Sequence, residues 1–345
     1  MEPETKTIMV IGALAADRIM VAPRVPDAGE SMVATQYEEA LGGKGAITAL
    51  SAYRSCHNKA SSYKGDGAIR VNMIGKVGDD LSGKMIKEEL DKSGIDVTGI
   101  EEVPNTRTSI CSATIEESSR ENQCLAIPDA TAAWKKGDFL KASQFGCTNW
   151  RDLIVAQMEI DKDVVENMIR TAGHASIPFC LNAAPASPIN ENLYRSITHL
   201  LVNESEAAIM CKVKRNKVKE KTWPKIAEQL RMGGVKNVVI TLGAKGAFYA
   251  NAKGSGHCPG YVVTVKDTMG AGDVFAGAYA SEYLRQDVGP NQDWDIESAV
   301  IRGNKAAAIA IQSSGAQEGI PWEDEIDKFA APLKEHEPPS QCRVI

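Results

Sequence analysis

The sequence predicts an α/β fold: a doubly wound, mostly parallel sheet with helices on both faces and a small β lid. Short apolar runs rich in β-branched residues alternate with segments whose apolar residues recur every three or four positions. These helical segments end near a glycine, which is a common helix terminator. Residues 18–42 and 105–116 have β-type residues without a helical period, and they predict the lid.

The predicted strands of the main sheet are apolar runs. They span Thr7–Ile11 and residues 71–77, 153–158, 177–183, 199–203 and 238–243. Between them lie helical stretches such as LSGKMIKEELDKSG, KDVVENMIRTAG and WPKIAEQLRMGG. Strands that alternate with helices form parallel sheets covered on both faces. Such sheets bind ligands beyond the carboxyl ends of their strands, so we expect the site there.

The chain divides into a core, a lid and a tail. The core takes residues 1–17, 43–104 and 117–335, the lid takes 18–42 and 105–116, and residues 336–345 form a flexible tail. A lid suits a small sheet inserted near the chain start. An edge extension of the main sheet explains the same two segments nearly as well.

Composition bounds the class of protein. The 345 residues are 43% hydrophobic and 24% charged, as in an ordinary soluble protein that buries a full core. A net charge of −6 argues against nucleic acid as a partner. No apolar run reaches membrane-spanning length, and the start MEPETKTIMV lacks the apolar segment of a secretion signal. We expect a cytoplasmic protein with no membrane partner.

Cysteine and histidine give no metal or disulfide pattern. The eight cysteines include no C-x-x-C pair, and the five histidines include no H-E-x-x-H. The C-terminal CRVI loosely fits a prenylation box with Cys342 as acceptor, but isoleucine is an atypical last residue. The basic run at 212–221 fits a solvated face, with nuclear targeting or anion binding as the alternative.

The stretch GDDLSGKM at 78–85 resembles a Walker A phosphate loop. It ends in Met85, where serine or threonine would hold Mg²⁺, and its two aspartates would repel phosphate. No G-x-G-x-x-G fingerprint occurs either. A nucleotide site in this chain is therefore of another type.

The stretch KDTMGAGDVFAGA at 266–278 has small residues where an apolar helix begins. The backbone N–H groups at a helix start have no intrahelical acceptor, and glycines let a phosphate approach them closely. Gly270, Ala271 and Gly272 can therefore form an anion hole for a phosphoryl group, with Asp273 beside the attacking hydroxyl. A plain helix cap is the alternative.

A second glycine-rich stretch, EEALGGKGAITAL, spans residues 38–50. It reads as a flexible turn that leads into a helix, and Lys44 could contact a phosphate or a sugar. Alone it is a weak signal, because Gly-Gly-Lys turns are common in loops.

Together the two stretches resemble the signatures of the ribokinase branch of the PfkB family of carbohydrate and nucleoside kinases. The resemblance covers about residues 7–330. Further agreeing blocks, in the family's order, are IGALAADRIMVAPRVPDAGE, LNAAPA, VNESEA, ITLGAKG and GAQEGIPWEDEID.

This resemblance implies ATP-dependent phosphorylation of a primary hydroxyl, with Asp273 as the base. Asn203 and Glu206 match the N-x-x-E element that arranges Mg²⁺ and the phosphates. The nucleotide loop matches Thr241, Gly243 and Gly246, and Asn304 falls where a residue lines the adenine. The resemblance also implies a lid that closes over the sugar and that can join two copies in a homodimer.

The resemblance also implies a K⁺ site beside the anion hole. Its ligands align with Asp267 and the carbonyls of Met269, Ala310, Ser313 and Gly315. Oxygen donors of this kind suit a hard cation. Gly319 replaces a serine of that site, so one side-chain oxygen is missing.

The sugar site departs from the family pattern at two positions. Ribose-contacting positions are matched by Asp17, Gly43, Lys44 and Glu159, but Ala15 and Ile47 replace two asparagines. Two uncompensated losses would weaken ribose binding by roughly 2–6 kcal/mol. Ribose remains the preferred acceptor, and a nucleoside or modified pentose is the alternative. The second alternative is that the protein is a catalytically silent sensor.

Overall fold

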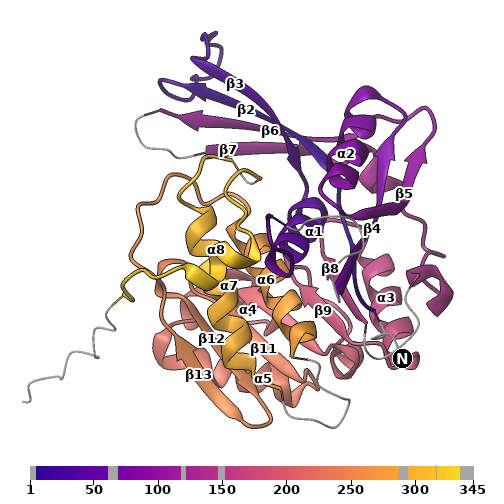
Figure 1. The fold of residues 1–345 in the computed structure, drawn as a ribbon, viewed down its shortest axis with the longest axis vertical. Helices are drawn as coiled ribbons and strands as arrows, with labels where there is room; N and C mark the ends of the chain where they lie inside the picture. Colours follow the sequence, from indigo (N-terminus) through magenta and orange to yellow (C-terminus); the bar gives the residue numbers. More distant parts are fainter. Residues whose placement is uncertain are drawn as a thin grey trace, which may run out of the picture.

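A computed structural model describes residues 5–60, 69–117, 122–146, 152–286, 294–315 and 317–334. Within these residues the main sheet has nine strands in the order β13-β12-β11-β10-β9-β8-β1-β4-β5 (Figure 1). In chain order they are β1 (Lys6–Ile11), β4 (Ile69–Gly78), β5 (Asp96–Val103), β8 (Leu153–Gln157), β9 (Phe179–Asn182), β10 (His199–Asn203), β11 (Asn237–Thr241), β12 (Ala247–Asn251) and β13 (Gly254–Cys258). All neighbours from β5 to β11 pair in parallel, and β12 and β13 are antiparallel. The predicted fold class is confirmed.

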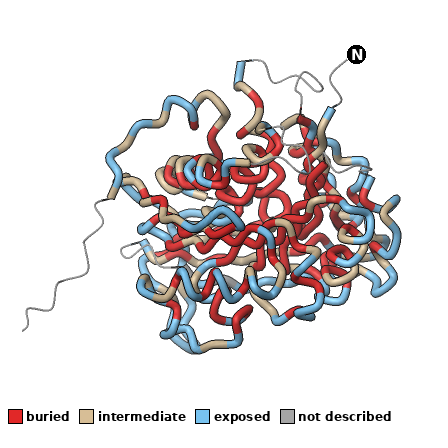
Figure 2. Tube along the Cα trace, turned by 90° about the horizontal axis from the view of Figure 1, so that it is seen from below, coloured by how far each residue is buried: buried red, intermediate tan, exposed pale blue. Residues whose placement is uncertain are grey.

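Helices cover both faces of this sheet. One apolar core joins it to α1 (Lys44–Ser55), α2 (Leu81–Lys92), α6 (Ala271–Arg285) and α7 (Ile296–Ala310). A second core joins the other face to α3 (Lys162–His174), α4 (Glu204–Met210) and α5 (Trp223–Met232). The short α8 (Glu323–Lys328) packs near α7. Figure 2 shows the buried segments running through the middle of the molecule.

Helix α6 is central to this arrangement because it lies between α1 and α7. Its small residues have a packing role as well as a chemical one. A Cβ at Gly277 would lie 2.6 Å from the backbone of α1, so only glycine allows the two helices to approach this closely. Part of the glycine- and alanine-rich motif is therefore explained by packing alone.

A second sheet of four strands, in the order β3-β2-β6-β7, stands off the main sheet (Figure 1). Its strands are β2 (Ala15–Ala22), β3 (Gln36–Gly42), β6 (Ser109–Glu116) and β7 (Asn122–Ile127). The segments predicted as a lid supply β3, β6 and most of β2. Strand β7 lies outside them, in a stretch that the sequence analysis placed in the core. Its described side chains are exposed, so it shows no alternation between buried and exposed positions.

Two remaining features bear on the sequence analysis. No helix among the described residues is long and apolar enough to cross a membrane. The C-terminal CRVI with Cys342, in the predicted tail 336–345, lies outside the described residues.

Candidate active site

The start of α6 follows from Gly270, which caps the helix with a backbone φ of 70° that favours glycine. Asp273, in the first turn, donates its backbone N–H to the Gly270 carbonyl at 2.9 Å, and Ala271 donates to Thr268 at 3.3 Å. The N–H groups of Gly270 and Gly272 have no acceptor among the described residues. Two donors at the positive end of α6 are therefore free to bind an anion.

The Asp273 side chain is buried, with 7% of its surface exposed. Its Oδ2 lies 3.5 Å from Lys44 Nζ, and its Oδ1 accepts a hydrogen bond from Asn182 Nδ2 at 3.0 Å. Burial raises the pKa of Asp273 to about 6; Lys44 opposes this rise, and Glu159 and Glu206 add to it. The negative charge of Asp273 in turn raises the pKa of Lys44. The site thus holds a carboxylate that titrates near neutral pH.

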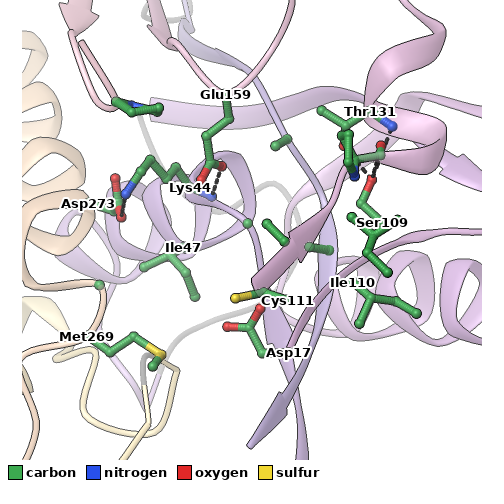
Figure 3. Close-up of a pocket in the computed structure, with 18 of the residues that line it drawn as sticks. Asp17, Lys44, Ile47, Ser109, Ile110, Cys111, Thr131, Glu159, Met269 and Asp273 are labelled. Carbon is green, nitrogen blue, oxygen red and sulfur yellow. Dashed lines mark hydrogen bonds and ion pairs between the residues drawn. The ribbon is translucent and has the colours of Figure 1, made fainter. Parts of the chain in front are cut away.

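A cavity of ≈ 430 Å³ opens beside Asp273, between the two sheets (Figure 3). All six residues expected at a sugar site line it: Ala15, Asp17, Gly43, Lys44, Ile47 and Glu159. The glycine-rich turn explains how they converge. Gly43 has a φ of 87° and is the N-cap of α1, and a Cβ at Gly42 would collide with the Asp17 carboxylate. The next residue, Lys44, donates its backbone N–H to Glu159 Oε2 at 2.9 Å.

Asp17 is the unsatisfied acid of this cavity. It is 8% exposed, and its carboxylate, unlike its backbone in strand β2, has no hydrogen-bond partner among the described residues. Burial raises its pKa to about 7; nearby Glu159 adds to the rise and Lys44 opposes it. A buried carboxylate without a partner is costly, so Asp17 is poised to accept hydrogen bonds from a bound molecule.

Much of the remaining cavity wall is apolar (Figure 3). It includes the buried Ile47 and Ala15, together with Ile110, Ala126 and Pro128. Two hydroxyls in this region were not predicted from the sequence, because no motif marks them. Ser109 Oγ donates to the Pro128 carbonyl at 2.7 Å and lies 2.6 Å from Thr131 Oγ1.

A second cavity of ≈ 210 Å³ shares Lys44, Gly270 and Asp273 with the first. It is lined also by Ala271, Gly272, Asn182, Asn203, Glu206 and Thr241. Asn203 and Glu206 form a capping box at the start of α4. Asn203 Oδ1 accepts the N–H of Glu206 at 2.9 Å, and Glu206 Oε2 accepts the N–H of Asn203 at 2.7 Å. Burial raises the pKa of Glu206.

Three residues expected at a nucleotide site gather elsewhere, around Cys258 of β13. Gly246, at a φ of 89°, packs so closely that a Cβ would lie 2.1 Å from the Cys258 carbonyl. Asn304, on α7, donates its amide to that carbonyl at 3.2 Å. Gly243, at a φ of 57°, belongs to the same turn as Gly246. None of the three lines the 210 Å³ cavity.

Two of the residues expected at a cation site, Met269 and Gly315, are hydrogen-bonded to Asp267. Its Oδ1 accepts the N–H of Met269 at 2.9 Å, and its Oδ2 accepts the N–H of Gly315 at 3.0 Å. The Ala310 carbonyl accepts the N–H of Ser313 at 3.1 Å. A Cβ at Gly319 would lie 2.3 Å from that carbonyl, so this chain has no room for the missing serine.

The Walker-like stretch is a helix cap. Asp80 Oδ1 accepts the N–H of Gly83 at 2.9 Å, and Asp80 Oδ2 accepts the N–H of Thr108 at 2.9 Å. The Asp80 carboxylate therefore occupies the Gly83 N–H, one of the donors that a phosphate would need, which agrees with the rejection of this stretch as a phosphate loop.

Comparisons with known proteins agree with this geometry. The family described as pfkB family carbohydrate kinase matches residues 5–323. A ribokinase of Bacillus subtilis is 30% identical over 330 residues, covering 94% of this chain and 99% of the relative. A deoxyribokinase of Salmonella typhi is 28% identical, covering 93% and 98%. A solved structure of Arabidopsis thaliana ribokinase complexed with ribose and ATP shares the fold, with a TM-score of 0.77 at 23% identity, covering 96% and 100%.

Proposed function

The chain belongs to the pfkB family of carbohydrate kinases, and from this premise we propose that it transfers the γ-phosphoryl group of ATP to the primary hydroxyl of a pentose, ribose being the preferred acceptor. The observation that carries the proposal is the meeting of two cavities at one buried carboxylate. The 430 Å³ cavity suits a polyol, the 210 Å³ cavity suits phosphate, and both are lined by Asp273 and Lys44.

In the acceptor cavity, Asp17 and Glu159 accept hydrogen bonds from sugar hydroxyls. Each hydrogen bond to a carboxylate contributes about 1.5–3 kcal/mol. Lys44 neutralises part of the charge of Asp17 and Asp273, so that three acids share one small site. The primary hydroxyl is then placed against Asp273.

Transfer breaks the bond between the γ-phosphorus and the bridging oxygen of ADP and forms a bond from the sugar oxygen. The hydroxyl proton moves to Asp273 Oδ2, and ADP leaves. Because the proton becomes acidic late in a loose transition state, Asp273 mainly aligns the nucleophile. The free N–H groups of Gly270 and Gly272 stabilise the charge of the transferring phosphoryl group.

Magnesium would be held beside the phosphates by Asn203 and Glu206. Their capping hydrogen bonds use one side-chain oxygen each, which leaves Glu206 Oε1, at the wall of the phosphate cavity, without a partner among the described residues. No group of three or more acidic, histidine or cysteine side chains suited to a metal occurs in the described part of the chain. The pair of Asn203 and Glu206 fits Mg²⁺, because this ion binds through few carboxylates together with the phosphates of its substrate. Bound there, Mg²⁺ would neutralise the charge of the phosphates.

Potassium would be held by Asp267 and the carbonyls of Met269, Ala310, Ser313 and Gly315. The two hydrogen bonds of Asp267 hold residues 269 and 315 together, which supports such a site. Its position just before Gly270 lets a cation strengthen the positive potential of the anion hole. We also propose that the small sheet acts as a lid; its exposed Leu125 and Ile127 would suit contact with a second copy.

The apolar wall supports a second acceptor class. Ala15 and Ile47, together with Ile110 and Ala126, offer no side-chain hydrogen bond to hydroxyls that point toward them. A pentose that lacks a hydroxyl, or a nucleoside whose base fills this region, would suit the wall. If Ile47 sets this preference, Ile47→Asn should lower turnover of that acceptor and improve turnover of ribose. A loss of turnover with no gain on ribose would count against this second class.

The test is ADP release by the purified protein with ATP, Mg²⁺ and K⁺. The acceptors are ribose, 2-deoxyribose, other pentoses, fructose and several nucleosides, and Asp273→Asn is the matched control. Ribose turnover equal to the best acceptor supports the preferred function. Turnover confined to a nucleoside or deoxy sugar supports the second class. ATP binding without turnover of any acceptor overturns both and favours a sensor.

A further inference from the structure

Asn182 is the last residue of β9, at the carboxyl end of the main sheet between β8 and β10. It is 7% exposed, and its Nδ2 donates to Asp273 Oδ1 at 3.0 Å. It lines the phosphate cavity but not the acceptor cavity. Within the described part of the chain, its side chain makes one hydrogen bond, the one to the proposed base.

We propose that Asn182 is the positioning residue of Asp273: it fixes the plane of the carboxylate and holds it in the ionised state. This inference rests on the proposed function. With Oδ1 engaged by the amide, Oδ2 is the oxygen that faces Lys44 and the region shared by the two cavities. A free carboxylate would rotate between its two oxygens, whereas a carboxylate held in place presents one acceptor to the hydroxyl.

The amide also acts on the protonation state. A hydrogen bond donated to a carboxylate favours the charged form. The charged groups around Asp273 are Lys44 on α1, Glu159 after β8 and Glu206 on α4, and the two glutamates oppose ionisation. An amide donor counters them without adding a charge that would bind the phosphates too tightly. Lysine at this position would add such a charge, and leucine would leave Oδ1 buried without a donor.

The variants are Asn182→Leu, which keeps the branched shape without the amide, and Asn182→Ser, which leaves space. Asn251→Leu is the matched control, since Asn251 also ends a strand and is 8% exposed, yet lines neither cavity. The readouts are kcat, KM for the acceptor and the acid limb of the pH profile of kcat. That limb reports Asp273 in the complex, where the acceptor already occupies Asp17.

We expect both Asn182 variants to lower kcat by about 10- to 100-fold and to move the acid limb up by about one pH unit. KM for the acceptor should stay within about threefold of wild type, because Asn182 does not line that cavity. Asn251→Leu should change none of these values. An unmoved acid limb, or a larger effect on acceptor KM than on kcat, overturns the positioning role. Failure of the proposed function is seen separately, as absent wild-type turnover or full activity of Asp273→Asn.

Discussion

Replacing Asp17 with asparagine should stabilise the free protein and at the same time impair it. Asp17 has a pKa near 7, against a reference value of 3.8, because it is buried without a hydrogen-bond donor. At about 1.4 kcal/mol for each pKa unit, ionising it costs the folded state up to roughly 4 kcal/mol. Asparagine still loses the hydration of an amide, so we expect a gain of about 1–3 kcal/mol at pH 8.

The dependence of folding stability on pH gives the direction of the effect of Asp17→Asn. The folded protein binds the Asp17 proton more tightly than the unfolded chain does. The contribution of Asp17 to the free energy of unfolding is therefore fully present below the unfolded pKa near 4 and is lost as the pH rises toward 7. The gain of Asp17→Asn should be absent near pH 4 and complete at pH 8.

The assay is the Tm of both proteins from pH 4.5 to 8.5. For a chain of 345 residues, 1 kcal/mol corresponds to roughly 1–2 °C, so we expect Tm to rise by about 2–5 °C at pH 8. The kcat/KM for the acceptor should fall by about 10²-fold or more, because the carboxylate proposed to accept hydrogen bonds from the sugar hydroxyls is lost. The control is Asp27→Asn, whose side chain is 91% exposed. An equal Tm at pH 8, or a gain that is the same at pH 5, refutes the argument.

Three further predictions concern the transfer site. Asp273→Asn should lower kcat by about 10²- to 10⁴-fold. In the wild type, a plot of log kcat/KM against pH should fall with a slope near two below pH 6, since Asp17 and Asp273 both take up protons. A slope that Asp17→Asn leaves unchanged contradicts this. Gly272→Ala should fold normally, because no atom lies within 4 Å of its added Cβ. It should nevertheless raise KM for ATP by about tenfold or more, because the added methyl group fills part of the phosphate cavity. Unchanged ATP kinetics would exclude an anion hole there. Gly319→Ser, which restores the ribokinase residue, should lower Tm rather than strengthen K⁺ activation, because its Cβ would meet the Ala310 carbonyl; K⁺ titrations of both proteins check it.

Most of the interior of the main sheet was predictable from the sequence, whereas its two edge strands and β12 were not. The six predicted strands correspond to β1, β4, β8, β9, β10 and β11, which are consecutive in the sheet. Strands β5, β12 and β13 lie outside that block, and β5 and β13 are the two edges. An edge strand is half solvated, so β5 carries mostly polar or exposed residues and lacks the apolar run that marks a buried strand.

The same distinction holds for the site. Gly270 and Asp273 were predictable because helix geometry and phosphate binding fix them within a few neighbouring residues. Asn182 was not, because its contact with Asp273 joins residues 91 positions apart through the order of the strands. The Ser109–Thr131 pair likewise depends on how the small sheet meets the core. Motifs predicted the groups for which we propose a chemical role, and the fold brings beside them the groups that we propose orient them.

The most direct test of the central claim is the identity of the phosphorylated product. Ribose labelled with ¹³C would be incubated with ATP, Mg²⁺, K⁺ and the protein, and the product examined by ³¹P and ¹³C NMR. The two cavities that meet at Asp273 predict one sugar phosphate, with phosphorus coupled to the carbon of the primary hydroxyl and formed in equal amount to ADP. Inorganic phosphate without a sugar phosphate, or phosphorus on the anomeric carbon, would contradict the account.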